Sequence, residues 1–238
     1  MKDKRLATAE LYDSIVYKSK IYRIGDKPFF DLVKKFVKKG MTVYEPGCGT
    51  GLITKEIAKI KGVNIIASDP SSALLIGAKK RLSKFNNVKL VRKSAIGFRI
   101  EPADVIVMRY VYHHILDNEK QRFVKTMFSN LKKKGKMLIL DEFIPYYSSK
   151  KEWKKSLTNY HDKKTEIALK LKDKLTADCE QESKKLGLAK VDEYKVHLKL
   201  FEKQLKNAGF IKIRKFLVKH PKLKDSKPLG MYIIIAER

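Results

Sequence analysis

The chain is short of the residues that would place it in a secreted or membrane-spanning class. It has two cysteines in 238 residues, Cys48 and Cys179, too few for a disulfide framework. Its longest apolar runs have about the length of a strand, whereas a membrane-spanning helix needs roughly 20 residues. The first residues, MKDKRLATAELYD, lack the apolar stretch of a secretory signal. We therefore expect a cytoplasmic protein without a membrane span.

Acidic residues are also scarce, because 26 Asp and Glu stand against 54 Lys and Arg, a formal net charge of +28. A field of this sign attracts polyanions such as RNA or anionic lipid surfaces. However, 45 of the 54 cations are lysine, and bidentate reading of phosphates and bases favours arginine. An RNA-binding surface and a merely lysine-rich solvated surface both stay open. The densest patch is residues 211–227, with seven Lys or Arg against one Asp.

Apolar runs of strand length alternate with helical stretches, which is the pattern of a parallel α/β sheet. The expected strands cover residues 41–45, 64–69, 88–94, 103–110, 136–143, 210–220 and 231–237. The linker between the last two is too short for a crossover helix and predicts an antiparallel pair. The helix that starts at Asp117 is expected to run through Leu131 and to end at Gly135.

Two segments lie outside this sheet. Residues 1–40 predict a helical cap of two helices. Residues 148–190 predict a helical lid over the carboxyl edge of the sheet, because their apolar side chains recur at helical spacing. The pattern therefore divides the chain into the cap, a core of residues 41–147, the lid, and residues 191–238, whose helix at 191–207 and last two strands complete the core.

The stretch VYEPGCGTGL, residues 43–52, carries glycines at alternate positions, 47, 49 and 51. Glycines allow a tight turn and a close approach of backbone to a ligand. The spacing differs from the G-x-G-x-x-G of dinucleotide sites, and Glu45 lies just before it. A carboxylate repels a diphosphate but favours a ligand that carries an ammonium and a sulfonium. Asp69, at the end of the second strand, is placed to bind a ribose diol.

With these residues the chain resembles the class I S-adenosylmethionine-dependent methyltransferases. The matching segments are EPGCGTG, IIASDP, ADVIVMRYVYHHIL, LKKKGKMLILDEF and FEKQLKNAGFIKIR. The resemblance runs from about Val43 to the C-terminus and excludes the lid. It implies a Rossmann-like, seven-stranded, mostly parallel sheet in the order 3-2-1-4-5-7-6, with strand 7 antiparallel and helices on both faces. It also implies S-adenosyl-L-methionine as the methyl donor, bound in residues 41–147.

The resemblance assigns donor-binding residues by position. The loop residues would surround the methionine part, Asp69 would hold the ribose hydroxyls, and Pro70 would lie beside the adenine. The family often has an acid after strand three, where this chain has Ser94 and Ala95 instead, which leaves the adenine contact open. The full set implied is Glu45, Gly47, Cys48, Gly49, Gly51, Asp69, Pro70, Ser94, Ala95 and Arg109.

Methyl transfer from a sulfonium needs alignment and exclusion of water, and a base only where the acceptor must lose a proton. Candidate catalytic residues follow strands four and five: Tyr110, His113, His114 and Glu142. Adjacent histidines at a helix start point in different directions, so we expect at most one to face the acceptor. Purely structural roles stay open for each of the four. No metal site is expected, because the histidine pair lacks a spaced partner.

Three functions fit these patterns. The first is a methyltransferase that acts on an O, N or C atom of a small molecule. The second is an RNA methyltransferase, or a related tRNA-modifying enzyme, favoured by the basic charge. The third is a non-catalytic protein that keeps the donor site, and the intact glycine loop argues against it. Oligomeric state stays open.

Overall fold

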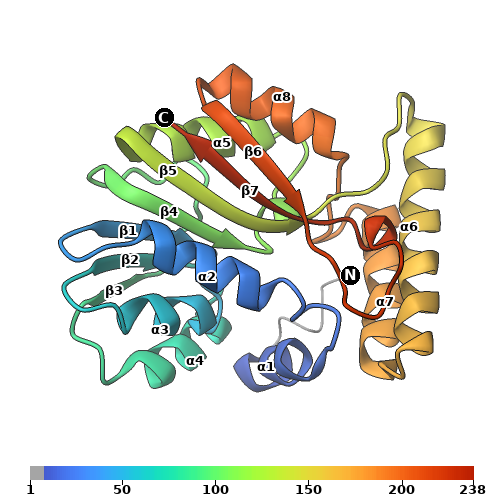
Figure 1. Cartoon of the computed structure of the whole chain (residues 1–238), viewed down its shortest axis with the longest axis horizontal. Coiled ribbons are helices and arrows are strands. Elements are labelled where there is room, and N and C mark those ends of the chain that lie inside the picture. The colour runs from blue at the N-terminus through green and yellow to red at the C-terminus, as the bar shows by residue number, and fades with distance from the viewer. Residues whose placement is uncertain (1–7) are drawn as a thin grey trace.

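The computed structural model describes residues 8–238, and its centre is a seven-stranded sheet in the order β3-β2-β1-β4-β5-β7-β6 (Figure 1). The strands are β1 (Thr42–Pro46), β2 (Asn64–Ser68), β3 (Val88–Val91), β4 (Ala103–Arg109), β5 (Leu131–Glu142), β6 (Ile211–Leu217) and β7 (Met231–Glu237). Strands β1 to β5 pair in parallel, whereas β7 runs antiparallel to both β5 and β6. The predicted fold class and strand order are confirmed.

The helices cover both faces of this sheet and extend beyond its carboxyl edge (Figure 1). They are α1 (Ala9–Lys18), α2 (Asp26–Phe36), α3 (Leu52–Ala58), α4 (Ser72–Leu82), α5 (Lys120–Ser129), α6 (Lys150–Lys170), α7 (Lys174–Ala189) and α8 (Leu198–Ala208), with short 3₁₀ turns η2 (Tyr112–His114) and η3 (Lys227–Leu229). In residues 8–238 no helix combines the length and the apolar character needed to cross a membrane.

The central strands are apolar on both faces because neighbouring residues of one strand point into two different cores. Val105 and Leu138 pack in the core that contains the apolar sides of α2 and α3. Ile106 and Ile139 pack in the opposite core, with α5 and α8. This double burial holds the carboxyl ends of β1, β4 and β5 at one rigid edge.

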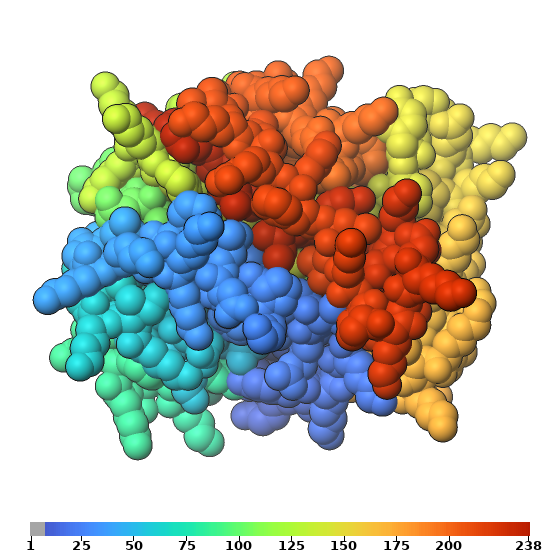
Figure 2. Space-filling view, in the orientation of Figure 1, coloured from blue at the N-terminus to red at the C-terminus, as the bar shows by residue number. Residues whose placement is uncertain are grey.

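Helices α6 and α7 form an antiparallel pair that stands beyond that edge, at the right of Figure 1. A small apolar cluster of Ile21, Ala168, Ala177 and Leu229 joins this pair to the N-terminal segment and to η3. On the face seen in Figure 2, the N-terminal segment meets the red β6–β7 connection, which in turn meets the lid. The lid therefore packs against the body of the protein through several separate parts of the chain.

Three helix boundaries differ from the prediction, the first being the start of α5, which lies at Lys120 and not at Asp117. Helix α5 ends at Ser129 and β5 begins at Leu131, so Gly135 lies inside a strand and does not end a helix. The β4–β5 register shifts between Ala103 and Val105, and this irregularity accommodates the longer strand. Helix α8 begins at Leu198, not at residue 191, because the His197 side chain accepts from the Leu200 N–H and caps it there.

Candidate functional site

The turn between β1 and α3 is built on glycines in the left-handed region. Gly47, Gly49 and Gly51 have φ of +69°, +53° and +76°. A Cβ at Gly47 would meet Val111 at 2.7 Å, whereas a Cβ at Gly49 would meet nothing nearer than Tyr12 at 3.7 Å. Gly49 faces a cavity, so its missing side chain leaves room there for a ligand.

This cavity, called the loop cavity below, has a volume of ≈300 Å³ and lies where β1, β2, β3 and β4 end. Its lining contains most of the residues predicted for the donor: Gly47, Gly49, Asp69, Pro70, Ser94, Ala95 and Arg109. Glu45 and Cys48 line a small adjoining space of ≈20 Å³ that shares Tyr12, Gly47 and Arg109 with it. Gly51 lies in neither lining and packs against Leu82 instead.

Asp69 is held in place by the backbone around it. Its Oδ2 accepts from the Gly49 N–H at 2.9 Å and its Oδ1 from the Ser71 N–H at 2.8 Å. Burial raises the pKa of the Asp69 carboxyl, and these two N–H donors oppose the rise. Since each carboxylate oxygen has two acceptor positions, both oxygens can accept a further hydrogen bond from a diol in the loop cavity.

Glu45 is a buried carboxyl, 3% exposed, whose Oε2 accepts from the Thr54 hydroxyl at 2.6 Å. Burial raises its pKa to about 8, the Thr54 hydrogen bond opposes the rise, and the negative charge of Asp69 adds to it. A cationic group in the adjoining space would restore the ionised form. Two carboxylates and an open Gly49 therefore fit a sulfonium nucleoside with a free ammonium, and they disfavour a diphosphate.

Helix α1 is attached to the glycine turn by polar contacts. Asp13 accepts from the Thr50 hydroxyl at 2.6 Å and from Arg81 Nη2 at 2.6 Å. Tyr12, the preceding residue, lines the loop cavity, the space beside Glu45 and a further chamber described next. Burial raises the pKa of its hydroxyl. The N-terminal helix thus forms part of the site wall.

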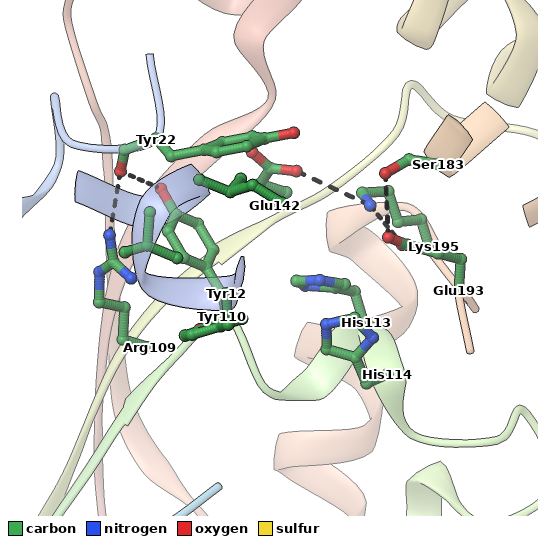
Figure 3. Close-up of a pocket in the computed structure, with 12 residues that line it drawn as sticks. Tyr12, Tyr22, Arg109, Tyr110, His113, His114, Glu142, Ser183, Glu193 and Lys195 are labelled. Atoms are coloured by element: carbon green, nitrogen blue, oxygen red, sulfur yellow. Dashed lines mark hydrogen bonds and ion pairs between the residues drawn. The ribbon is translucent and has the colours of Figure 1, made fainter. Parts of the chain in front are cut away.

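A second space, called the lid chamber below, has a volume of ≈80 Å³ and lies between α1, the end of β5 and the lid (Figure 3). Its lining shares Tyr12, Arg109, Tyr110 and His114 with the loop cavity. The two spaces therefore adjoin at these four residues.

Arg109 and Tyr110 fasten the N-terminal segment to the end of β4. Arg109 Nε donates to Asp26 at 2.7 Å, and the Tyr110 hydroxyl donates to the Tyr22 carbonyl at 2.8 Å. Tyr110 has a φ of +56°, a conformation that non-glycine residues rarely adopt. Figure 3 shows both side chains directed at Tyr22. The Tyr110 hydroxyl is therefore committed to a backbone contact.

His113 is oriented by a buried carboxylate. Its Nδ1 lies 2.5 Å from Asp141 Oδ1, and Asp141 also accepts N–H donors from Val111, Tyr112 and Glu142. Burial alone would raise the pKa of Asp141, but His113 and the N–H donors hold it below its usual value. Asp141 therefore positions His113.

His114 lines the lid chamber together with His113, although adjacent histidines were expected to point in different directions. The 3₁₀ turn brings the two rings together, with centroids 4.1 Å apart. His114 Nδ1 donates to the Asp192 carbonyl, which turns this ring toward the chamber as well. Burial and the neighbouring His113 lower the pKa of His114 to about 4.

Glu142 lines the lid chamber but is paired with cations of the lid side. Lys164 of α6 binds its Oε1, and Lys195 Nζ lies 3.8 Å from its Oε2. Lys164 also lies 2.9 Å from Glu180 of α7, and Lys195 lies 2.6 Å from Glu193. All five side chains are buried. This network connects β5 to the lid. It also pairs Glu142, a candidate catalytic residue from the sequence, with two cations.

The sequence did not predict several residues that line the lid chamber. Glu193 and Lys195 lie in the connection between α7 and α8 and were expected on a helix. Together with His113 and His114, Glu193 forms a group that could hold a metal ion, which the sequence did not predict. Of the aromatic residues before β1 and in the lid, Tyr12 and Tyr22 line the chamber, whereas Trp153 and Tyr160 pack inside the lid.

Comparison with known proteins identifies the family. The model of the methyltransferase domain matches residues 21–172. A methyltransferase of Anoxybacillus flavithermus, named as uncharacterised, is 31% identical over 137 residues, 56% of this chain and 63% of that protein. A carboxy-S-adenosyl-L-methionine synthase of Campylobacter fetus is 25% identical over 148 residues, 61% of this chain and 62% of that protein. The chain thus spans less than two thirds of these relatives.

Solved structures share the fold at low sequence identity. The N-methyltransferase NodS of Bradyrhizobium japonicum, in complex with S-adenosylhomocysteine, has a TM-score of 0.66 at 11% identity and covers 99% of this chain and 95% of that one. A phosphoethanolamine N-methyltransferase of Haemonchus contortus, in complex with S-adenosylmethionine, has a TM-score of 0.60 at 17% identity and covers 89% of this chain and 52% of that one.

Proposed function

The chain belongs to the class I S-adenosylmethionine-dependent methyltransferase family, and we propose that it methylates an O, N or C atom of a small molecule held in the lid chamber. When bound, S-adenosylmethionine supplies an activated methyl group on a sulfonium. Gly49 and Asp69 bind it in the loop cavity, and Glu45 binds its ammonium from the small adjoining space. The acceptor lies beyond Tyr12, Arg109, Tyr110 and His114, which separate the two spaces.

The small size of the lid chamber is the observation that carries the proposal. Its volume of ≈80 Å³ suits a small molecule and leaves little room for a polynucleotide. Proteins that bind single-stranded nucleic acid use an open basic groove lined with aromatic side chains. Here residues of α1 and of the lid line the acceptor position, and the buried ion pairs of Lys164 with Glu142 and Glu180 attach the lid to β5. Phosphoethanolamine, the acceptor named for one structural neighbour, is a molecule of this size class.

The residues of the chamber orient and shield the acceptor. Asp141 binds His113 through Nδ1, so His113 Nε2 is the atom that takes a hydrogen bond or a proton from an acceptor hydroxyl or amine. Glu142, Glu193 and Lys195 supply charged groups that recognise polar substituents. Closure of the chamber excludes water, which favours the in-line displacement.

The RNA alternative has one observation in its favour. Strand β6 is an edge strand whose Lys212, Arg214 and Lys215 are exposed, and they belong to the basic patch of residues 211–227. This patch is part of the C-terminal hairpin and contributes Asp225 and Lys227 to other surface pockets but no residue to the lid chamber.

Transfer of labelled methyl from S-adenosylmethionine to a fractionated extract tests the proposal. We expect label in the low-mass fraction, a reduced rate with Asp69→Ala at low donor concentration, and no ribonuclease-sensitive label. Label in RNA that ribonuclease removes, and that a charge-reversing change of Lys212 and Lys215 abolishes, would overturn the small-molecule acceptor. Donor binding without transfer to either fraction would point to the non-catalytic alternative.

A further inference from the structure

Three metal-ligating side chains meet at the wall of the lid chamber. His113 and His114 come from η2, and Glu193 comes from the connection between α7 and α8, about 80 residues further along the chain. One ligand atom of each lies within 4.8 Å of those of the other two. His113 and Glu193 are buried and His114 is half-buried, and all three line the same chamber (Figure 3).

The hydrogen bonds of the two histidine rings determine which nitrogen of each ring carries the lone pair. A backbone carbonyl can only accept, so the contact of His114 Nδ1 with the Asp192 carbonyl requires a proton on Nδ1. Asp141 already accepts three backbone N–H donors as a carboxylate, so His113 Nδ1 donates to it as well. In the neutral rings, both Nε2 atoms therefore carry lone pairs.

This arrangement matches the surroundings of metal-binding histidines. Such histidines almost always donate their second N–H to a carboxylate or a backbone carbonyl, which fixes the ring and its tautomer. His113 has the carboxylate of Asp141, and His114 has the carbonyl of Asp192.

We propose that His113, His114 and Glu193 bind one divalent first-row transition-metal ion, with an open coordination position directed into the lid chamber. Two imidazoles and one carboxylate suit ions such as Zn²⁺, Fe²⁺ or Co²⁺, whereas Mg²⁺ and Ca²⁺ prefer oxygen ligands throughout. Three protein ligands with an open position are the arrangement of catalytic sites, since structural zinc sites take four.

Lys195 and Ser183 bind the carboxylate of Glu193 in this structure. Lys195 Nζ lies 2.6 Å from Glu193 Oε2, and the Ser183 hydroxyl donates to Oε1 at 3.1 Å. An ion on Glu193 would compete with Lys195, which lies 3.8 Å from Glu142 and can keep that partner. In this structure the Lys195 ammonium neutralises Glu193, as a bound metal ion would.

The ion would give the chamber a second way to handle an acceptor, and this role, unlike the binding itself, rests on the proposed function. An acceptor hydroxyl at the open position would have a lower pKa, because a bound divalent ion stabilises the alkoxide, and it would release its proton to solvent as it binds. His113 Nε2 would then be a ligand and no longer a proton acceptor.

Titration of the untagged protein with Co²⁺, after removal of metals by dialysis against a chelator, tests the site. We expect one ion per chain and a visible absorption band of a low-symmetry Co²⁺ site, with competition by Zn²⁺. His114→Ala and Glu193→Gln should each weaken binding by at least about tenfold. His220→Ala is the control, because His220 lies on the β6–β7 connection, outside the lid chamber.

Circular dichroism of each variant shows whether it folds, and Glu193→Gln keeps the shape of the side chain. Absence of Co²⁺ binding to the wild type, or binding that both chamber variants retain at wild-type affinity, would overturn the proposal. Binding lost in His220→Ala alone would do the same. Because no donor or acceptor is present, failure of this test leaves the proposed methyl transfer standing, and failure of methyl transfer leaves this test valid.

Discussion

Replacement of Glu45 by glutamine is expected to remove a proton release that accompanies donor binding. Burial raises the pKa of Glu45 to about 8 from the ordinary 4.5, so at pH 7 about nine tenths of the ligand-free protein carries a proton on it. The ammonium of a bound S-adenosyl ligand favours the carboxylate and expels that proton. At pH 7 binding should therefore release close to one proton, and above pH 9 close to none.

The same shift limits the stability of the ligand-free protein. Between pH 4.5 and about 8 the folded form holds a proton on Glu45 that the unfolded chain has released. The stabilisation by this proton is therefore complete below pH 4.5 and is lost as the pH rises through about 8. A change from 4.5 to about 8 corresponds to at most about 5 kcal/mol. Glu45→Gln should show a weaker loss of stability over this interval, measured by urea unfolding at several pH values.

Isothermal titration calorimetry with S-adenosylhomocysteine measures the release directly. The observed enthalpy at pH 7 is plotted against the ionisation enthalpy of the buffer, and the slope gives the number of protons released. We expect a slope near one for the wild type and near zero for Glu45→Gln, with a loss of affinity of about 1.5–3 kcal/mol. Asp69 stays in both proteins, so the difference belongs to Glu45. Equal slopes in the two proteins would refute the assignment.

Three further predictions concern the loop cavity and the lid. Asp69→Ala should weaken donor binding by about 1–3 kcal/mol in calorimetry, because ribose hydroxyls lose their acceptor, and unchanged affinity would remove Asp69 from the site. Gly49→Ala places a Cβ in the loop cavity at a φ of +53° and should lower donor affinity at least about tenfold. The control is Gly40→Ala, where φ is +85° and no atom of the described residues lies within 4 Å of the new Cβ, and it should lower stability alone. Equal affinities in the two alanine variants would contradict the cradle at Gly49. Lys164→Met leaves Glu142 and Glu180 without their buried cationic partner and should lower the free energy of unfolding by about 3–5 kcal/mol. The exposed control Lys170→Met should lower it by at most about 1 kcal/mol. Similar unfolding midpoints for the two lysine variants would show that the network does not stabilise the lid.

The loop cavity could be predicted because its signals are local in the chain. Glycines at 47, 49 and 51 adopt a left-handed backbone that favours glycine, and this preference is visible in the residue types alone. Asp69 follows β2, so the parallel sheet brings it to the same edge as the turn after β1. The alternation of apolar strands and helical stretches predicted a parallel α/β sheet, and the pairing of β1 to β5 confirms it.

The lid chamber could not be predicted, because it is formed by residues distant in the sequence. Glu193 and Lys195 sit among charged residues that read as the solvated face of a helix, and only the cap at His197 shows that this segment is a loop. The partner of His113 is Asp141, 28 residues further along the chain, and no short-range pattern distinguishes such a pair. Tyr12 lines all three spaces of the site, yet in the sequence it is one of several aromatics at helical spacing.

The central claim is that the loop cavity and the space beside Glu45 select an S-adenosyl amino acid over a dinucleotide through two buried carboxylates. Equilibrium dialysis of the purified protein with labelled S-adenosylmethionine tests it most directly, with S-adenosylhomocysteine and NAD⁺ as competitors. The account predicts one site per chain that S-adenosylhomocysteine empties and NAD⁺ leaves filled. Displacement by NAD⁺, or no retained label with a correctly folded wild type, would contradict it.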